Sequence, residues 1–335
     1  FVKTRDLAIH YQKQGSGAPV ILLHGWPQTA YEWRHQIDHL ARSFTVYAPD
    51  NRGFGLTDKP RIRITRDLLA RDVIEFMDAL GLAQATLIGH DWGGIIGFKV
   101  AMDYADRVDR IGLIDTSTTH WPSWAGHAYW AKVPDVAMAF FSRCSDDFMG
   151  WCFAGERPDY GSVVAPFPPD PLPGALYDWC DSKALSHYRS AFSPPDVHFA
   201  STQYYSSGLP MHRVQLTAQG EETFDYIGGA GCVRIWNHPQ GFVAHPDVAE
   251  PLCFGPEDWN KTFDKPALFV YSPMLVPAGF KEGEPVAGYQ LGGNSWEDSI
   301  VRPFPQLQTR AISCGHYIPE EAPDALNAVL DEFLL

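Results

Sequence analysis

The stretch ATLIGHDWGG at residues 85–94 decides the fold. Its apolar first half predicts a buried strand, its centre a tight turn, and its last residues the start of a helix. Gly89 and Gly93 flank the turn and remove side chains that would clash there. This spacing is typical of a nucleophile elbow, whose central side chain stands on a strained turn at the carboxyl end of a sheet.

The central residue of this elbow is Asp91, where a serine would be expected. A serine at this position attacks carbonyl carbon, whereas a carboxylate is a poor nucleophile for acyl transfer. A carboxylate can instead displace a leaving group from saturated carbon and form an ester that water then cleaves. The sequence therefore predicts covalent catalysis at Asp91.

Short apolar runs alternate with helical patterns on both sides of the elbow. Strands are expected at residues 20–23, 44–48, 85–89, 111–114, 267–271 and 309–312. Helices are expected at residues 31–40, 67–80, 323–335 and from the elbow to about residue 104. This alternation predicts an α/β fold with a mostly parallel, twisted sheet and helices on both faces.

The alternation breaks after Asp115. Residues 116–262 are rich in proline, aromatic residues and short helical pieces. We therefore expect a large, mainly helical cap inserted after the strand that ends near Asp115. The core would then consist of residues 1–115 and 263–335.

Length and charge narrow the class of protein. A chain of 335 residues with 45% hydrophobic residues can bury a sizeable core. Its net charge of −14 and the lack of a basic run argue against nucleic acid and anionic membranes as partners. No apolar stretch approaches the roughly 20 residues that span a bilayer. No signal peptide is visible, so we expect a cytoplasmic protein, although the chain begins at Phe1 and a removed leader stays an alternative.

The six cysteines are scattered, without a CxxC pair or a spacing typical of metal sites. Reduced thiols in a cytoplasmic enzyme are the expectation, and a disulfide within the middle segment is the alternative. We expect neither a metal nor a cofactor.

Asp91 needs two partners: a base that activates water, and an acid that orients the base. His316 follows the last predicted strand and is the candidate base; the alternative is a histidine on a surface loop. No carboxylate follows the strand at 267–271 directly, and Glu282 is too far along. Asp115 ends the strand before the insertion. Neighbouring parallel strands would bring it to the same sheet edge as Asp91, so Asp115 is the candidate acid. The alternative is that Asp115 caps a helix or lies in a loop without a catalytic role.

Backbone amides complete the predicted site. The N–H groups of Trp26 and Trp92 would form an oxyanion hole for ester hydrolysis. A cis Trp26–Pro27 bond would point the Trp26 amide inward. The Trp92 indole would hold a leaving halide or form an apolar wall.

Four motifs carry a family resemblance: HGWP at 24–27, DNRGFG at 50–55, GHDWGG at 89–94 and GHYIPEEAP at 315–323. Together they resemble the aspartate-nucleophile branch of the α/β-hydrolase family. That branch includes epoxide hydrolases, haloalkane dehalogenases and fluoroacetate dehalogenases. The resemblance implies the α/β-hydrolase fold and places His24 in the substrate-binding loop.

The resemblance extends into the insertion. SHYRSAF at 186–192 and QYYS at 203–206 are similar to cap helices of this branch. Tyr205 matches the family residue that donates a proton to the epoxide oxygen or a hydrogen bond to the halide. Tyr204 is the fallback, and two packing aromatics on a cap helix are the alternative to both.

Missing residues favour one activity within the branch. Trp26 replaces the asparagine that haloalkane dehalogenases usually carry after HG. Trp92 and Ile95 replace the two arginines of fluoroacetate dehalogenases, and the region around Ala139 and Phe140 lacks their histidine-tryptophan pair. That last absence also removes a second ring-opening donor. His120, His127 and Tyr129 are the candidates to replace it.

The resemblance therefore implies an epoxide hydrolase that converts an epoxide to a vicinal diol, with water as co-substrate. A dehalogenase with the same three residues is the alternative, and a non-catalytic binding protein is a minor one. The substrate is expected to be a small apolar or aromatic epoxide, or an organohalide. Residues 216–256 are longer than in the family relatives, so this stretch would line the substrate entrance or form a homodimer contact.

Overall fold

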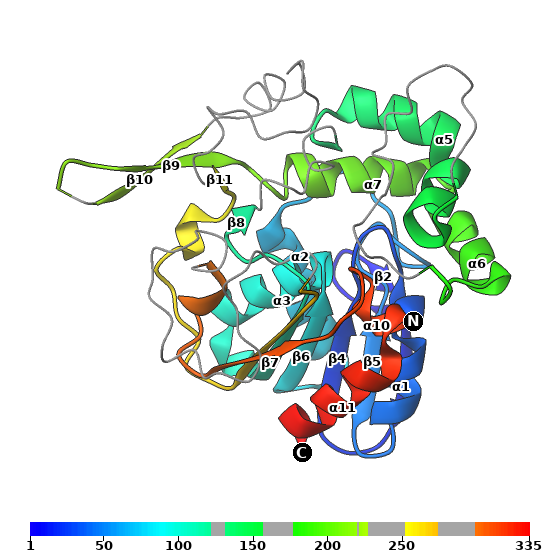
Figure 1. The fold of residues 1–335 in the computed structure, drawn as a ribbon, viewed down its shortest axis with the longest axis horizontal. Helices are drawn as coiled ribbons and strands as arrows, with labels where there is room; N and C mark the ends of the chain where they lie inside the picture. Colours follow the sequence, from blue (N-terminus) through cyan, green and yellow to red (C-terminus); the bar gives the residue numbers. More distant parts are fainter. Residues whose placement is uncertain (122–130, 157–176, 220, 227–251, 274–298) are drawn as a thin grey trace.

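The computed structural model describes residues 1–121, 131–156, 177–219, 221–226, 252–273 and 299–335 (Figure 1). A seven-stranded sheet has the order β13-β12-β7-β6-β4-β5-β3. Its strands are β3 (Tyr11–Gly15), β4 (Pro19–Leu23), β5 (Thr45–Pro49), β6 (Ala85–His90), β7 (Val108–Ile114), β12 (Ala267–Tyr271) and β13 (Leu307–Ala311). All neighbouring strands are parallel except β3 and β5. The predicted mostly parallel sheet is confirmed.

Helices cover both faces of this sheet (Figure 1). The longer ones are α1 (Arg34–Leu40), α2 (Arg66–Ala79), α3 (Trp92–Asp103) and α11 (Pro323–Leu334). The short ones are η1 (Ala30–Trp33), η2 (Ala105–Arg107), η4 (Pro256–Asp258) and α10 (Ile318–Glu321). The helix predicted at 31–40 is thus split into η1 and α1.

Alternate residues of the strands pack into two separate hydrophobic cores. Leu23 and Leu87 belong to the core that includes residues of α2 and α3, whereas Leu22 and Ile88 belong to the core that includes residues of α1 and α11. Successive side chains of a strand point to opposite faces, so a strand buried on both faces must be apolar throughout. This requirement explains the continuous apolar runs in the sequence.

The chain between β7 and β12 leaves the sheet. Its described α-helices are α5 (Pro134–Ala154), α6 (Ser182–Phe192) and α7 (Pro195–Ser206), which lie beyond one end of the sheet (Figure 1). A separate four-stranded sheet has the order β10-β9-β11-β8. Its strands are β8 (His120–Trp121), β9 (His212–Leu216), β10 (Glu222–Tyr226) and β11 (Leu252–Cys253).

This second sheet was not predicted from the sequence, although the helices α5, α6 and α7 make up most of the regular structure described in the insertion. Strands β9 and β10 pair antiparallel along their full length. Their sequences, HRVQL and ETFDY, mix polar and apolar residues and contain no apolar run. Pairing with each other, rather than burial in the core, stabilises such strands, and that partner is not visible in local sequence.

The strands at the amino-terminal end of the chain were also not predicted from the sequence. Strands β1 (Val2–Lys3) and β2 (Ala8–Ile9) form a small antiparallel pair, and β3 adds antiparallel to β5. Most β3 residues are exposed, because an edge strand needs no apolar run.

None of the helices in the described part of the chain combines the length and apolarity needed to span a bilayer. Five cysteines lie in the described residues and carry free thiols: Cys144, Cys152, Cys180, Cys253 and Cys314. Cys232 lies outside the described residues.

Candidate active site

The elbow has the predicted strand, turn and helix. Asp91 lies between β6 and α3 with φ 49° and ψ −119°, a conformation that L residues rarely adopt. A Cβ atom on Gly93 would lie 1.9 Å from the carbonyl oxygen of Leu23, and one on Gly89 would lie 2.2 Å from that of Gly93. The two glycines therefore allow the turn to pack directly against β4.

The structure brings Asp91, Asp115 and His316 together. His316 Nδ1 lies 2.5 Å from Asp115 Oδ2, and His316 Nε2 lies 3.5 Å from Asp91 Oδ2. The Ser272 amide donates to Asp115 Oδ1 at 3.2 Å and orients this carboxylate. The three residues follow β6, β7 and β13. Glu282, the rejected acid, lies outside the described residues.

The charges of this group stabilise one another. Burial alone would lower the pKa of His316, but hydrogen bonds and charges from Asp115 and Asp91 raise it to about 10. Burial would raise the pKa of Asp91, yet its interactions with His316, His90 and the Trp26 amide lower it. At neutral pH the resting site therefore holds an imidazolium beside an ionised Asp91.

Trp26 donates its backbone N–H to Asp91 Oδ1 at 2.8 Å. The Trp26–Pro27 bond is cis, as expected from the sequence. The Trp92 amide makes no such bond to Asp91 among the described contacts. The structure therefore places one of the two predicted amides on the carboxylate, in the position that an oxyanion hole requires.

His24 supports the loop that carries Trp26. Its Nε2 accepts a hydrogen bond from the Asn51 amide at 2.8 Å, and the Asn51 side chain donates to the His24 carbonyl at 2.9 Å. The HGWP and DNRGFG motifs are thus joined through this buried histidine. The contacts assign it a supporting position rather than one on the reacting carboxylate.

The two cap tyrosines have different surroundings. The Tyr205 ring meets the Trp26 ring edge-on at 5.0 Å and the Trp92 ring at 5.5 Å. Burial raises the pKa of Tyr205 well above its usual value, and the charge of Asp91 adds to the rise. The hydroxyl of Tyr204 instead donates to the Arg52 carbonyl at 3.0 Å. Tyr205 therefore keeps its proton beside Asp91, whereas Tyr204 is bonded to the core.

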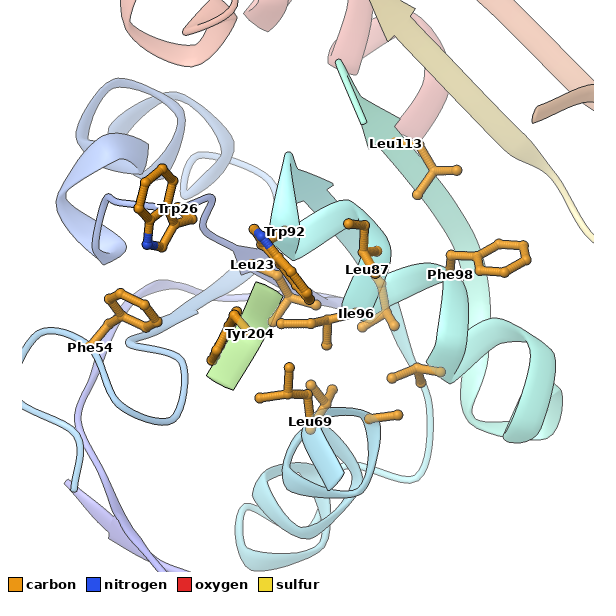
Figure 2. Packing of buried hydrophobic residues seen from close by; sticks show 14 of the residues in the cluster. Leu23, Trp26, Phe54, Leu69, Leu87, Trp92, Ile96, Phe98, Leu113 and Tyr204 are labelled. Atoms are coloured by element: carbon orange, nitrogen blue, oxygen red, sulfur yellow. The ribbon is translucent and has the colours of Figure 1, made fainter. Parts of the chain in front are cut away.

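Aromatic rings surround the Trp26 side of the site. Phe148 of α5 lies 5.5 Å from the Trp26 ring, and Phe141 and Phe192 each lie 6.2 Å from it. In Figure 2 the Trp92 indole lies between Trp26 and Ile96, next to Tyr204, and the Trp92 and Tyr204 rings are 4.8 Å apart. This wall suits an apolar or aromatic ligand.

Of the three candidates for a second cap donor, the described residues include His120, which packs against Trp259. The His120 ring lies 5.0 Å from the Trp259 ring, and burial together with Arg302 lowers its pKa to about 3. His127 and Tyr129 lie outside the described residues. Much of the stretch 216–256 does too, so its role at the entrance or in a dimer stays a prediction.

Buried polar residues that the sequence analysis missed lie next to the site. His90 Nε2 is 2.9 Å from the His316 carbonyl oxygen, and His90 Nδ1 is 3.4 Å from Glu32 Oε2. Tyr188 of α6 donates to Glu320 Oε1 at 2.8 Å. All four side chains are buried. His90 lies in the GHDWGG motif and Glu320 in the GHYIPEEAP motif. These positions were the signal in the sequence that could have identified both residues.

Comparisons with known proteins agree with the fold. The family model of the alpha/beta hydrolase fold matches residues 18–149. Soluble epoxide hydrolase of Corynebacterium sp. (strain C12) is 48% identical over 107 residues, which cover 32% of this chain and 37% of that enzyme. The match therefore spans little more than a third of this relative.

Longer matches have lower identity. Epoxide hydrolase A of Mycobacterium tuberculosis is 28% identical over 99% of this chain and 96% of its own length. The solved structure of epoxide hydrolase CorEH without ligand superposes with a TM-score of 0.69 at 22% identity, covering 98% of this chain and 95% of the other. This last likeness establishes the fold alone. The chain is therefore similar to proteins of the α/β-hydrolase fold, with epoxide hydrolases among its relatives.

Proposed function

We propose that this protein is an epoxide hydrolase that forms a covalent ester at Asp91. The observation that carries the proposal is the Asp91 carboxylate itself. It stands on the elbow with Oδ1 on the Trp26 amide and Oδ2 facing His316, which contacts Asp115. A carboxylate held in this way can attack saturated carbon, and the ester it forms already has a base beside it. The names of the relatives support this reading.

In the first step Asp91 Oδ2 attacks a ring carbon, and the bond from that carbon to the ring oxygen breaks. The Tyr205 hydroxyl gives its proton to the departing oxygen. The product is a hydroxyalkyl ester whose carbonyl oxygen, Oδ1, stays on the Trp26 amide. Because the ester is neutral, the imidazolium of His316 loses one of its two carboxylate partners. The imidazolium then gives a proton to the Tyr205 phenolate, which leaves Tyr205 protonated and His316 neutral.

In the second step neutral His316 takes a proton from water, and the hydroxide attacks the ester carbonyl carbon. The Trp26 amide stabilises the negative charge on Oδ1. The intermediate expels the alkoxide, which takes the proton of the newly formed carboxylic acid. The diol leaves, with Asp91 ionised and His316 protonated as at the start. The balance is one epoxide and one water to one diol.

The proposal assigns residues 116–262 as a cap over a core formed by 1–115 and 263–335. The aromatic side chains of α5 and α6 around Trp26, and Tyr205 of α7 beside Trp26 and Trp92, support this assignment. They would exclude bulk water and favour a small apolar or aromatic epoxide.

Trapping the ester tests the mechanism. His316→Gln should form the ester with an aryl epoxide but not hydrolyse it, so intact-protein mass spectrometry should show an adduct with the mass of the epoxide. Asp91→Asn is the control and should show none. No adduct across a panel of epoxides would contradict the covalent mechanism.

Incubation of the wild type with an aryl epoxide and with a bromoalkane distinguishes the two activities. Diol without bromide supports the epoxide hydrolase. Bromide without diol would show the dehalogenase that uses the same residues.

A further inference from the structure

Glu32 and His90 form a buried pair that the proposed reaction does not use. Glu32 lies in η1 and His90 ends β6, and the structure leaves neither side chain exposed to solvent. Glu32 Oε2 lies 3.4 Å from His90 Nδ1, and His90 Nε2 lies 2.9 Å from the carbonyl oxygen of His316. The pair therefore touches the backbone of the candidate base.

The partners determine where the protons of this pair lie. A carbonyl oxygen only accepts hydrogen bonds, so His90 Nε2 must carry a proton toward His316. In a neutral imidazole the other nitrogen, Nδ1, is then an acceptor. The group facing Nδ1 is Glu32, so the carboxyl group must supply the proton. A Glu32 carboxylate beside an imidazolium is the alternative arrangement.

Glu32 also holds the loop on the other side of Asp91. The Gly25 amide donates to the two carboxyl oxygens of Glu32 at 3.3 and 3.2 Å. Gly25 precedes Trp26, whose amide binds Asp91. A Cβ atom on Gly25 would lie 2.8 Å from that of Asp91, so the loop and the nucleophile are in close contact. One carboxyl group thus connects the Trp26 loop with the His316 loop.

Burial favours the neutral pair. It raises the pKa of Glu32 well above its usual value, against the hydrogen bond from the Gly25 amide, which favours the carboxylate. The charge of Asp91 adds to the rise, against smaller effects of His316 and Arg34. Burial and the charge of His316 lower the pKa of His90 to about 4, against opposing effects of Asp91 and Asp115. Glu320 and Tyr188 also lie within electrostatic range of Glu32.

We propose that Glu32 acts as a neutral carboxylic acid that positions His90 and, through it, the His316 loop for ester hydrolysis. It is a positioning residue, since it touches neither substrate nor the attacking oxygen. The inference rests on the proposed function of His316. It predicts that the second half of the reaction depends on Glu32 more strongly than the first, because only ester hydrolysis needs the base.

Two substitutions separate this role from a merely structural one. In Glu32→Gln the amide can accept from Gly25 and donate to His90 Nδ1, so it should restore both contacts. In Glu32→Leu both contacts are lost. Rapid quenching and mass spectrometry should show ester hydrolysis slowed about 10- to 100-fold in the leucine variant, because small displacements of a base are costly. Its ester should therefore accumulate, whereas the glutamine variant should not accumulate it.

Gln36→Leu is the matched control. Gln36 is equally buried and donates to the Pro319 carbonyl at 3.1 Å, but it does not contact His90. Its loss should lower the thermal midpoint without accumulation of ester. If Glu32→Gln accumulates ester as Glu32→Leu does, or if Gln36→Leu accumulates it equally, the positioning role is wrong.

Nitrogen NMR on the wild-type protein tests the proposal without depending on the folding of a variant. Nitrogen NMR of protein labelled at histidine reports which ring nitrogens carry protons. His90 should show one protonated and one unprotonated nitrogen between about pH 6 and about pH 9. Two protonated nitrogens would show the ion pair and overturn the proposal. If the wild type forms no ester at all, the proposed function fails, while the NMR result still tests the Glu32–His90 pair.

Discussion

Replacing Asp115 by asparagine should uncouple the two halves of the proposed reaction. The Asp115 carboxylate lies 2.5 Å from His316 Nδ1 and is one of the two groups that favour the imidazolium. Ester formation uses Asp91 and Tyr205 and should continue in Asp115→Asn. Ester hydrolysis needs His316 as an oriented base and should slow, so the ester should accumulate.

The size of the effect follows from the pKa of His316. A rise from 6.5 to about 10 corresponds to about 5 kcal/mol of preference for the charged ring. Asp115 and Asp91 share this preference, and the hydrogen bond to Asp115 is the largest raising contribution. Loss of Asp115 should therefore remove about half of it, and ester hydrolysis should fall by about 10²-fold or more.

The same substitution should change the pH dependence of stability. The folded pKa of His316 is raised, so its stabilisation is complete below about 6.5 and is lost as pH rises through about 10. In Asp115→Asn the folded pKa is closer to that of the unfolded chain. The thermal midpoint of the variant should therefore fall less steeply than that of the wild type between about pH 7 and about pH 10.

Rapid-quench mass spectrometry with an aryl epoxide, together with calorimetry across this pH range, provides the test. Accumulated ester and a flatter stability profile are the expected results. The reasoning is refuted if Asp115→Asn turns over at the wild-type rate, or if ester formation slows as much as hydrolysis. The first result would show that another acid orients His316, and the second would show that ester formation also depends on Asp115.

Further substitutions test other parts of the site. Tyr205→Phe should slow ester formation in stopped-flow assays by about 10²-fold because it removes the proton donor, whereas Tyr204→Phe should slow it by less than about 10-fold, and equal losses would contradict the assignment. Tyr188→Phe removes the 2.8 Å bond to Glu320 and should lower the free energy of unfolding in urea by about 1–3 kcal/mol, so an unchanged midpoint would speak against this cap-to-core bond. Gly93→Ala should prevent correct folding, because its Cβ would lie 1.9 Å from a carbonyl oxygen of β4, and circular dichroism would reveal a wild-type fold if this is wrong.

Much of the core was predictable because its signals are local. The apolar runs at β4 and β6 and the helical spacing in α2 reflect burial, which acts on each segment separately. The edge strand β3 and the hairpin of β9 and β10 were missed because pairing, not apolar burial, stabilises them. These strands are recognised only by the neighbouring strands with which they pair, and that pairing is determined by the fold.

By itself the sequence determined that Asp91 stands on an elbow, because the glycines around it allow a turn that other residues would block. It also indicated His316 and Asp115 by their places after strands. Only the tertiary structure decided that these two side chains meet, a contact between residues 201 positions apart. It alone showed that Glu32 and His90 connect the loops around Asp91. Such contacts depend on strand order and loop packing, which no local pattern of residues records.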